Sequence, residues 1–378
     1  MRDFTLIIPT CNAAQRLAAL LSYLESEKAE CRVLVLDSSD SEVLAANRAR
    51  AKTLKLDIEI VECPGLEIGE KCRGGLRKVA TDFCAFCDDG DIVILEGFRR
   101  CLDKLRRNQA ASMAQGCCFS FLARRDGDLE LSDFTNFPAS MDDASPVERL
   151  GRLFQHYQTA IHGIFRTSAV QRIFTALDPL SKALGRDLLW SALAVIEGQP
   201  ILVSDLTYGR GADAGNAADD AGPLEWFCTD PDSLVAEYLH YRGLLVAALM
   251  CRLDNELERD EVCDLLDVIH LRYFAQHAPD SLLDFVVQQE IAGVDFADYW
   301  PCHKANSPFQ DAAGEDTPQT AAPITMRGRA RRYLVFPSFY APPKGVSPQL
   351  DAIVHLIDVL DVYRPPFDLE QNPSSRTI

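Results

Sequence analysis

The sequence predicts an α/β fold in which a mostly parallel sheet is flanked by helices and followed by a helical C-terminal region. Short apolar runs alternate with segments of helical periodicity from Phe4 to Leu105, as in chains of strand–helix units. Polar clusters at 10–12, 37–39 and 88–91 each follow an apolar run. Because ligands of such sheets gather beyond the carboxyl ends of the strands, the three clusters predict one shared site.

The first strand and helix are predicted at the start of the chain. The run Phe4–Pro9 is apolar and predicts a buried strand. Asn12 is expected to be the N-cap of the following helix, with Gln15 at the third helical position as in a capping box. Leucines then recur at helical spacing, at 17, 20, 21 and 24.

Three more strands follow in the first third of the chain. They are predicted at Arg32–Leu36, near Leu56–Val61 and at Phe83–Cys87. Helices are expected over 68–80 and from Ile94 to Leu105.

The later chain mixes strands and helices. From about 111 to 132 the pattern is typical of strands, with a turn at 125–128. Further strands are predicted at Ala160–Arg166 and Pro200–Tyr208, with a helix between them. Beyond these strands we expect a loop at 212–223, a mainly helical stretch at 231–292, a linker at 303–325 and a helix at Leu350–Tyr363.

Composition excludes several classes of protein. The net charge of −18 argues against a nucleic-acid partner, because phosphate backbones require a basic surface. No apolar stretch reaches the roughly 18 residues expected of a membrane span, and the N-terminus lacks the apolar region of a signal peptide. The 13 cysteines are dispersed, which favours a cytoplasmic location over a disulfide framework.

Four runs resemble the family-two glycosyltransferases, which are inverting enzymes of the GT-A fold. They are TLIIPTCNAAQRL, VLVLDSSD, ATDFCAFCDDGDIV and Gly185-Arg186-Asp187. Together they cover roughly residues 3–210 in the order that the family shows. Two motifs depart from the family pattern: D-x-D-D has become D-D-G-D, and G-E-D has become G-R-D.

The resemblance implies a domain organisation and a function. Residues 1–215 are expected to form a GT-A glycosyltransferase domain, followed by a helical region at 216–302, a linker at 303–325 and a C-terminal tail with one helix at 326–378. The implied activity is metal-dependent, inverting transfer of a sugar from a nucleotide-diphosphate sugar. The acceptor stays open between a saccharide, a lipid-linked carrier and a protein side chain, and the helical region is expected to shape the acceptor side or a homo-oligomer contact.

The acidic run predicts a site for Mn²⁺ or Mg²⁺, because these ions prefer oxygen ligands. Such an ion would stabilise the charge that builds up on a diphosphate leaving group. The metal ligands are expected to be Asp89 and Asp91, and Asp88 with Asp91 is the other alignment of the motif. The plainer alternative is a solvated acidic turn.

The donor site is expected at the same strand ends. Asp37 occupies the family's nucleoside position, where a carboxylate accepts from base or ribose donors, and its alternative is a turn or cap residue. Lys71 could face the diphosphate or belong to a solvated helix face. The full set predicted to bind the donor is Pro9, Thr10, Asn12, Asp37, Ser39, Lys71, Asp88 and Asp89.

Asp187 is the predicted general base, since an acceptor hydroxyl must lose its proton as it attacks. The alternative is a helix first-turn aspartate that interacts with the macrodipole. His162 and Arg210 are weaker candidates. Two other functions remain open: a catalytically silent sugar-nucleotide-binding or scaffold protein, and a sugar nucleotidyltransferase, whose glycine-rich loop after the first strand is missing here.

Overall fold

The computed structural model describes residues 1–123, 129–135, 141, 145–155, 157–176, 183–212, 231–253 and 257–277. The predicted turn at 125–128, most of the loop at 212–223, the linker at 303–325 and the helix at Leu350–Tyr363 lie outside these residues.

The first four strands form the parallel half of the sheet, in the order β3-β2-β1-β4. They are β1 (Phe4–Thr10), β2 (Arg32–Asp37), β3 (Asp57–Glu62) and β4 (Phe83–Phe86). Thr10 is in register with Asp37, and Ile7 is in register with Phe86. The carboxyl ends of β1, β2 and β4 therefore meet at one edge, which the sequence predicted.

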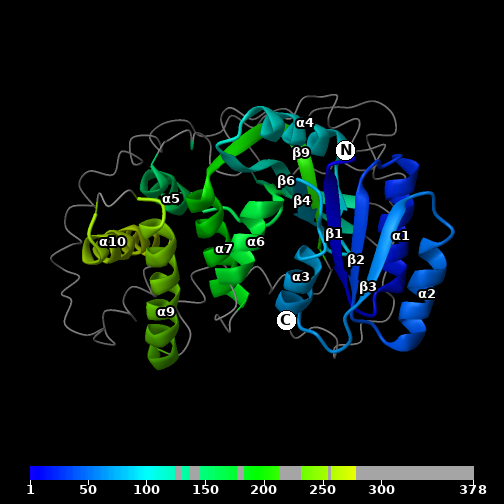
Figure 1. The fold of residues 1–378 in the computed structure, drawn as a ribbon, viewed down its shortest axis with the longest axis horizontal. Coiled ribbons are helices and arrows are strands. Elements are labelled where there is room, and N and C mark those ends of the chain that lie inside the picture. Colours follow the sequence, from blue (N-terminus) through cyan, green and yellow to red (C-terminus); the bar gives the residue numbers. More distant parts are fainter. Residues whose placement is uncertain are drawn as a thin grey trace.

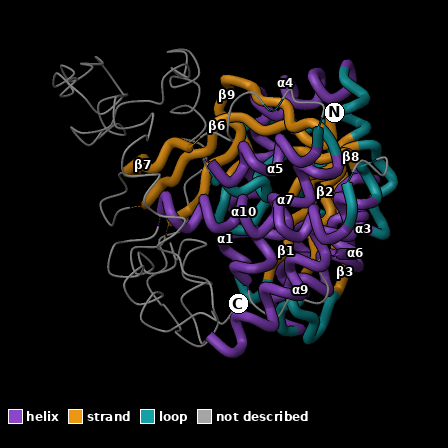
Figure 2. Tube along the Cα trace, turned by 90° about the vertical axis from the view of Figure 1, so that its left-hand side faces the viewer, coloured by secondary structure: helices purple, strands orange, loops and turns teal. Residues whose placement is uncertain are grey.

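The remaining described strands complete a nine-stranded sheet of mixed direction. They are β5 (Ile92–Val93), β6 (Ala111–Ala123), β7 (Leu129–Thr135), β8 (Ile164–Arg166) and β9 (Gln199–Ala212). β8 is antiparallel to β4 and to β6, whereas β6 and β9 are parallel. Figure 2 shows β6, β7 and β9 extending together to one side of the molecule.

Helices cover both faces of the sheet, as expected for an α/β fold. Side chains alternate along β1, so that Leu6 and Ile8 lie in one core and Ile7 lies in the other. The first core includes α1 (Ala14–Ser26) and α4 (Leu95–Arg107). The second core includes α3 (Ile68–Leu76), α5 (Pro146–Gln155), α6 (Thr167–Ala176) and α7 (Ala183–Glu197). The helix α2 (Ser41–Ala51) connects β2 to β3.

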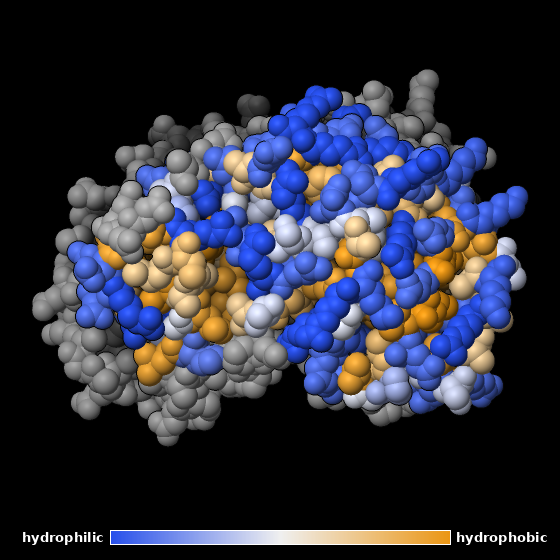
Figure 3. All heavy atoms as spheres, viewed as in Figure 1, coloured by the Kyte–Doolittle hydropathy of each residue, from blue (hydrophilic) through white to orange (hydrophobic). Residues whose placement is uncertain are grey.

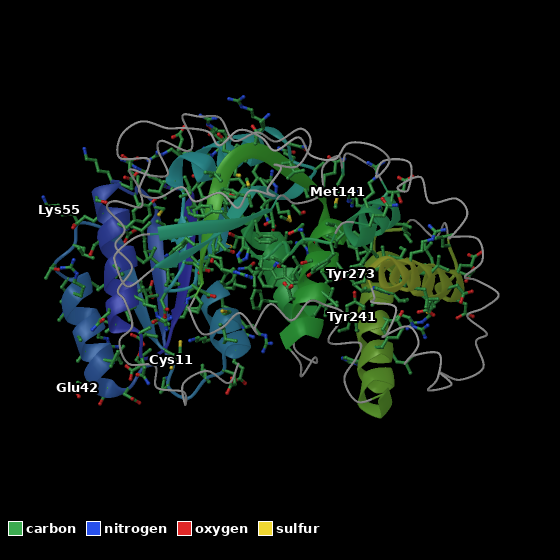
Figure 4. All side chains as sticks on the ribbon, turned by 180° about the vertical axis from the view of Figure 1, so that it is seen from behind. Cys11, Glu42, Lys55, Met141, Tyr241 and Tyr273 are labelled. Carbon is green, nitrogen blue, oxygen red and sulfur yellow. The ribbon has the colours of Figure 1, made fainter. Side chains whose placement is uncertain are left out.

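The last two described helices, α9 (Pro231–Met250) and α10 (Arg259–His277), belong to the second core. They lie at the opposite end of the molecule from β1–β3, with α7 between (Figure 1). Tyr241 and Tyr273 lie on the side of α9 and α10 that faces α7 (Figure 4). Since their side chains share one core with α5 and α7, these helices pack as part of the same folded unit.

The face of the molecule seen in Figure 1 carries both hydrophilic and hydrophobic residues. Hydrophilic residues gather over α4, and hydrophobic residues are exposed among polar ones over β1–β3 (Figure 3). No helix among the described residues has both the length and the apolar character of a membrane span.

Two local predictions were wrong. Ala13, and not Asn12, is the N-cap of α1, because Asn12 adopts a left-handed φ of 53° and binds a neighbouring loop instead. The strand predicted at Ala160–Arg166 begins only at Ile164, because Gly163 N donates to Ala160 O and closes a turn at 3.0 Å.

Candidate active site

The structure brings the three predicted clusters together. Thr10 at the end of β1 donates a hydrogen bond from Oγ1 to Asp89 Oδ2 at 2.7 Å. Ser38, after β2, donates from its backbone N–H to Thr10 O at 3.1 Å. The ends of β1, β2 and β4 are therefore joined through Thr10, and we call this edge the strand-end site.

Asn12 holds the loops after β1 and β2 together. Its backbone N–H donates to Ser39 Oγ at 2.7 Å. Its side-chain oxygen accepts from Asp40 N at 2.9 Å, and its amide donates to Asp40 Oδ2 at 3.2 Å. Asn tolerates the left-handed region better than most residues, which suits this position. Pro9 is buried inside β1, one residue before the junction.

The side chain of Asp37 is enclosed by protein. Only 1% of the residue is exposed. Its Oδ1 accepts from Ser39 N and its Oδ2 accepts from the side-chain amide of Asn47, both at 2.8 Å. Asp37 thus fixes the turn after β2 against α2 through Asn47, a partner that no sequence pattern indicates.

Lys71 places a buried positive charge at the strand-end site, and the residue is only 5% exposed. Its Nζ donates to Thr10 O at 3.0 Å and to Ser38 Oγ at 3.1 Å. An ammonium has three donors, and these described partners use two. The solvated-face alternative is therefore wrong for Lys71, and its charge favours the ionised form of Asp88.

The three aspartates after β4 have different surroundings. Asp88 reaches solvent, and partial burial of its carboxyl group together with the nearby Asp89 raises its pKa. Asp89 is half-buried and pairs with Arg16, whose Nε lies 3.3 Å from Asp89 Oδ1. The predicted acidic cluster thus contains a cation from α1 that the sequence analysis did not single out.

Asp91 is buried and tied to β9. Tyr208 OH donates to its Oδ2 at 2.5 Å, and Gly211 N donates to its Oδ1 at 2.8 Å. Burial and the nearby Asp88 raise the pKa of Asp91 to about 8. A side chain on Gly211 would put its Cβ 2.3 Å from Gly90 O. The glycine is required here for the close approach of β9 to the acidic loop.

The acidic loop can contribute to a metal site but does not complete one. Within the described residues, no group of three or more His, Cys, Asp or Glu side chains is arranged to hold an ion. A Mg²⁺ or Mn²⁺ ion bound with a diphosphate needs only one or two carboxylates. Asp88 is exposed and Asp89 is only half-buried, so both suit that role, whereas Asp91 is buried and both of its oxygens accept hydrogen bonds, from Tyr208 and Gly211.

Asp187 lies in the first turns of α7 and is half-buried. Tyr157 OH donates to its Oδ2 at 2.9 Å, and Thr159 Oγ1 donates to its Oδ1 at 2.6 Å. Burial raises the pKa of this carboxyl group, while the two hydrogen bonds oppose the rise. The carboxylate is therefore held in one orientation by two hydroxyl groups that sequence reasoning missed.

His162 connects this region to the acidic loop. Its ring stacks on Tyr208 with 4.1 Å between centroids, and Tyr208 binds Asp91. Burial and the nearby Arg210 lower the pKa of His162 to about 3, so its imidazole is neutral. Thr159 binds Asp187 and His162 stacks on Tyr208. The Cα atoms of Thr159 and His162 can lie at most about 11 Å apart, because they are three residues apart, so one short segment links the two carboxylate regions.

Comparison with known proteins supports the fold. No family model matches the chain, and no curated protein matches it. The structure of Staphylococcus aureus (S. aureus) TarS 1–349 in complex with UDP matches with a TM-score of 0.50 and 16% identity, over 79% of this chain and 78% of that chain. The same TarS segment with UDP-GlcNAc gives 0.49 and 17% identity, over 73% of each chain. The mannosyltransferase PcManGT from Pyrobaculum calidifontis, with GDP-Man and Mn²⁺, gives 0.41 and 12%, over 81% of this chain and 85% of that chain.

At these identities a match shows the fold alone, and the fold conclusion rests on the TarS complex with UDP. The predicted α/β fold of GT-A type is confirmed.

Proposed function

We propose that this protein is a glycosyltransferase that moves a sugar from a nucleotide-diphosphate sugar to an acceptor hydroxyl with inversion at the anomeric carbon. The observation that carries the proposal is the short segment 157–162. One end of it holds Asp187 through Tyr157 and Thr159, and the other end contacts the acidic loop through His162 and Tyr208. A base and a diphosphate site linked by one short segment would suit direct displacement.

The strand-end site is the donor site in this proposal. The turn fixed by Asp37 and the loop fixed by Asn12 would form the nucleoside side. Lys71, with its remaining donor, would approach the diphosphate. The S. aureus TarS match was solved with UDP, so uridine diphosphate sugars are the first donors to test.

A divalent cation, Mn²⁺ or Mg²⁺, would be held by Asp88 and Asp89 together with the diphosphate, and when bound it would neutralise charge on the leaving group. Arg16 would orient Asp89 through their ion pair. Asp91 would keep the loop in place through Tyr208 and Gly211.

Asp187 would accept the proton of the acceptor hydroxyl. Its carboxylate is oriented by two donors, which leaves lone pairs for a third group. The pKa raised by burial makes it a stronger base than an exposed aspartate.

The location proposed for this activity is the cytoplasm. Every cysteine among the described residues is a free thiol, which is what a reducing compartment maintains.

A donor panel tests the proposal. Uridine, guanosine, cytidine and thymidine diphosphate sugars would be titrated calorimetrically, and each would be assayed for release of nucleoside diphosphate with a panel of acceptors. Binding with acceptor-dependent release is expected for one nucleotide class. Binding without release across the panel would favour the catalytically silent binder, and no binding to any donor would reject the strand-end site.

A further inference from the structure

Tyr157 contacts Asp187 with its hydroxyl group and is itself bonded to α7. Its oxygen lies 3.2 Å from Ser191 Oγ, and Ser191 Oγ accepts from Ala160 N at 3.0 Å. One proton arrangement satisfies all of these contacts: Ser191 donates to Tyr157, and Tyr157 donates to Asp187. The hydroxyl group of Tyr157 is therefore fixed by the same helix that carries the carboxylate.

The ring of Tyr157 is held by two other helices. Phe154, in α5, stacks on it at 6.0 Å between centroids with 29° between planes. Tyr273, in α10, meets it edge to face at 6.1 Å and 67°. Phe154 and Tyr273 also contact each other at 5.5 Å. The three rings form a triangle, so a shift of α10 would move the hydroxyl group that contacts Asp187.

A polar network fixes α10 against α9. His270, only 2% exposed, lies with Nε2 3.0 Å from Tyr241 OH. Tyr238 OH donates to Asp267 Oδ1 at 2.6 Å, and Arg242 pairs with Asp267. Phe154 packs against the His270 ring at 4.7 Å. The pair of helices is thus a rigid support for the ring triangle.

We infer that Tyr157 is a positioning residue for Asp187, and that α9 and α10 serve the acceptor side of the site by holding the Tyr157 ring. This inference rests on the proposed function and gives the acceptor-side role expected of the helical region a specific structural basis. Asp187 and its two hydroxyl donors act as one unit, which α10 supports from outside the parallel half of the sheet.

Among the described residues, the hydroxyl groups of Tyr157 and Thr159, from the segment after α5, bind Asp187. Tyr273, from α10, is near enough for Asp187 to affect its pKa. Burial and the nearby Asp187 raise the pKa of Tyr273 to about 12, and the same two causes raise the pKa of Tyr157 well above its ordinary value. Both phenols stay protonated at neutral pH, so Tyr157 remains a donor to the carboxylate.

The first test measures the contact without any activity. Urea unfolding of Tyr157→Phe, Asp187→Ala and the double variant forms a double-mutant cycle. Residues in one hydrogen-bond network show coupling, here expected as a roughly 2- to 100-fold departure from additivity in the unfolding constant. Tyr23→Phe is the matched control, because it also removes a buried phenol oxygen, one that donates to Val93 O in the first core, and its cycle with Asp187→Ala should be additive.

The second test measures transfer against pH. Loss of a hydrogen bond to a charged group should move the acidic limb of the kcat profile up by about one to two pH units in Tyr157→Phe, with the donor KM unchanged. Tyr273→Leu should also move the acidic limb up and so lower kcat at acidic pH. Tyr273→Phe keeps the ring contact and should restore the wild-type profile.

Four outcomes of these tests distinguish the role of Tyr157, the role of α9 and α10, and the proposed function from one another. Coupling together with the shifted limb supports the inference. An unshifted limb in Tyr157→Phe, or absent coupling with normal transfer, overturns the role of Tyr157 alone. Tyr273→Leu with wild-type kcat overturns the role of α9 and α10. Coupling without transfer by the wild-type protein overturns the proposed function itself, and with it any role of Tyr157 in transfer.

Discussion

Replacing Asp187 by Asn tests the base directly, because the substitution keeps the shape of the side chain and removes the proton acceptor. In the structure, Oδ1 accepts from Thr159 and Oδ2 accepts from Tyr157. An amide supplies one oxygen for one of these donors. Its NH₂ group faces the other hydroxyl, which can rotate to accept. The local packing should therefore survive the change.

The expected loss is in the chemical step. General-base assistance typically contributes about 10²–10⁴-fold in rate, so kcat for transfer should fall by roughly that factor. Asp187 makes no described contact with the strand-end site, so the donor KM and the affinity for nucleoside diphosphate should stay near wild type.

The pH dependence of the free energy of unfolding supplies a control, because the direction of its change in Asp187→Asn can be worked out. Burial raises the folded-state pKa of Asp187 above 3.8, its ordinary value. The folded protein then holds this proton more tightly than the unfolded chain. The wild-type protein consequently loses stability as pH rises from the unfolded pKa through the folded pKa. Asp187→Asn lacks this loss, so from acidic to neutral pH its stability relative to wild type should increase.

The assay combines steady-state transfer, calorimetry with UDP, and urea unfolding at acidic and neutral pH. Transfer within a few-fold of wild type would refute the assignment of the base. A variant that is less stable at neutral pH and also loses UDP binding would show that Asp187 supports the fold instead.

Three further changes test the donor side. Asp37→Ala should raise the donor KM far more than it lowers kcat, because it frees the turn after β2; kinetics in which kcat collapses while KM holds would contradict this. Mn²⁺ should strengthen nucleoside diphosphate binding in calorimetry, and Asp88→Asn should abolish that gain while Asp91→Asn keeps it; an equal loss in Asp91→Asn would return Asp91 to the ligand set. Gly211→Ala should lower both thermal stability and donor affinity, because its Cβ would lie 2.3 Å from Gly90 O. The matched control Gly74→Ala, in α3, has no atom within 4 Å of the new Cβ and should stabilise the protein by about 0.4–1 kcal/mol; a similar loss in both variants would exclude the close contact as the cause.

The strand-end site could be predicted because it depends on short-range pattern. Each parallel strand is an apolar run, and the residue after its last apolar position must lie at the carboxyl edge of the sheet. Thr10 and Asp37 are therefore neighbours by register alone. The resemblance added the acidic loop after β4, which the structure joins to Thr10 through Asp89.

The partners of these residues could not be predicted in the same way. Asn47 reaches Asp37 from within α2, and Arg16 reaches Asp89 from α1. Both positions look like ordinary polar sites on a helix, because nothing in helical periodicity marks which polar residue turns toward a strand end. The N-cap prediction for Asn12 failed for a related reason: a side chain with both a donor and an acceptor can satisfy a neighbouring loop as well as a helix end.

The acceptor side shows why the sequence identified the base without its environment. Asp187 was found through a three-residue motif, but the groups that orient it come from a segment about 30 positions earlier. The ring that supports this segment, Tyr273, comes from a helix more than 80 positions later. Such contacts depend on how α5, α7 and α10 pack, which periodicity does not encode. If α10 holds Tyr157 as inferred, substitutions that loosen α10 should leave donor binding at the strand-end site unchanged and still slow transfer, because the base would lose its orientation.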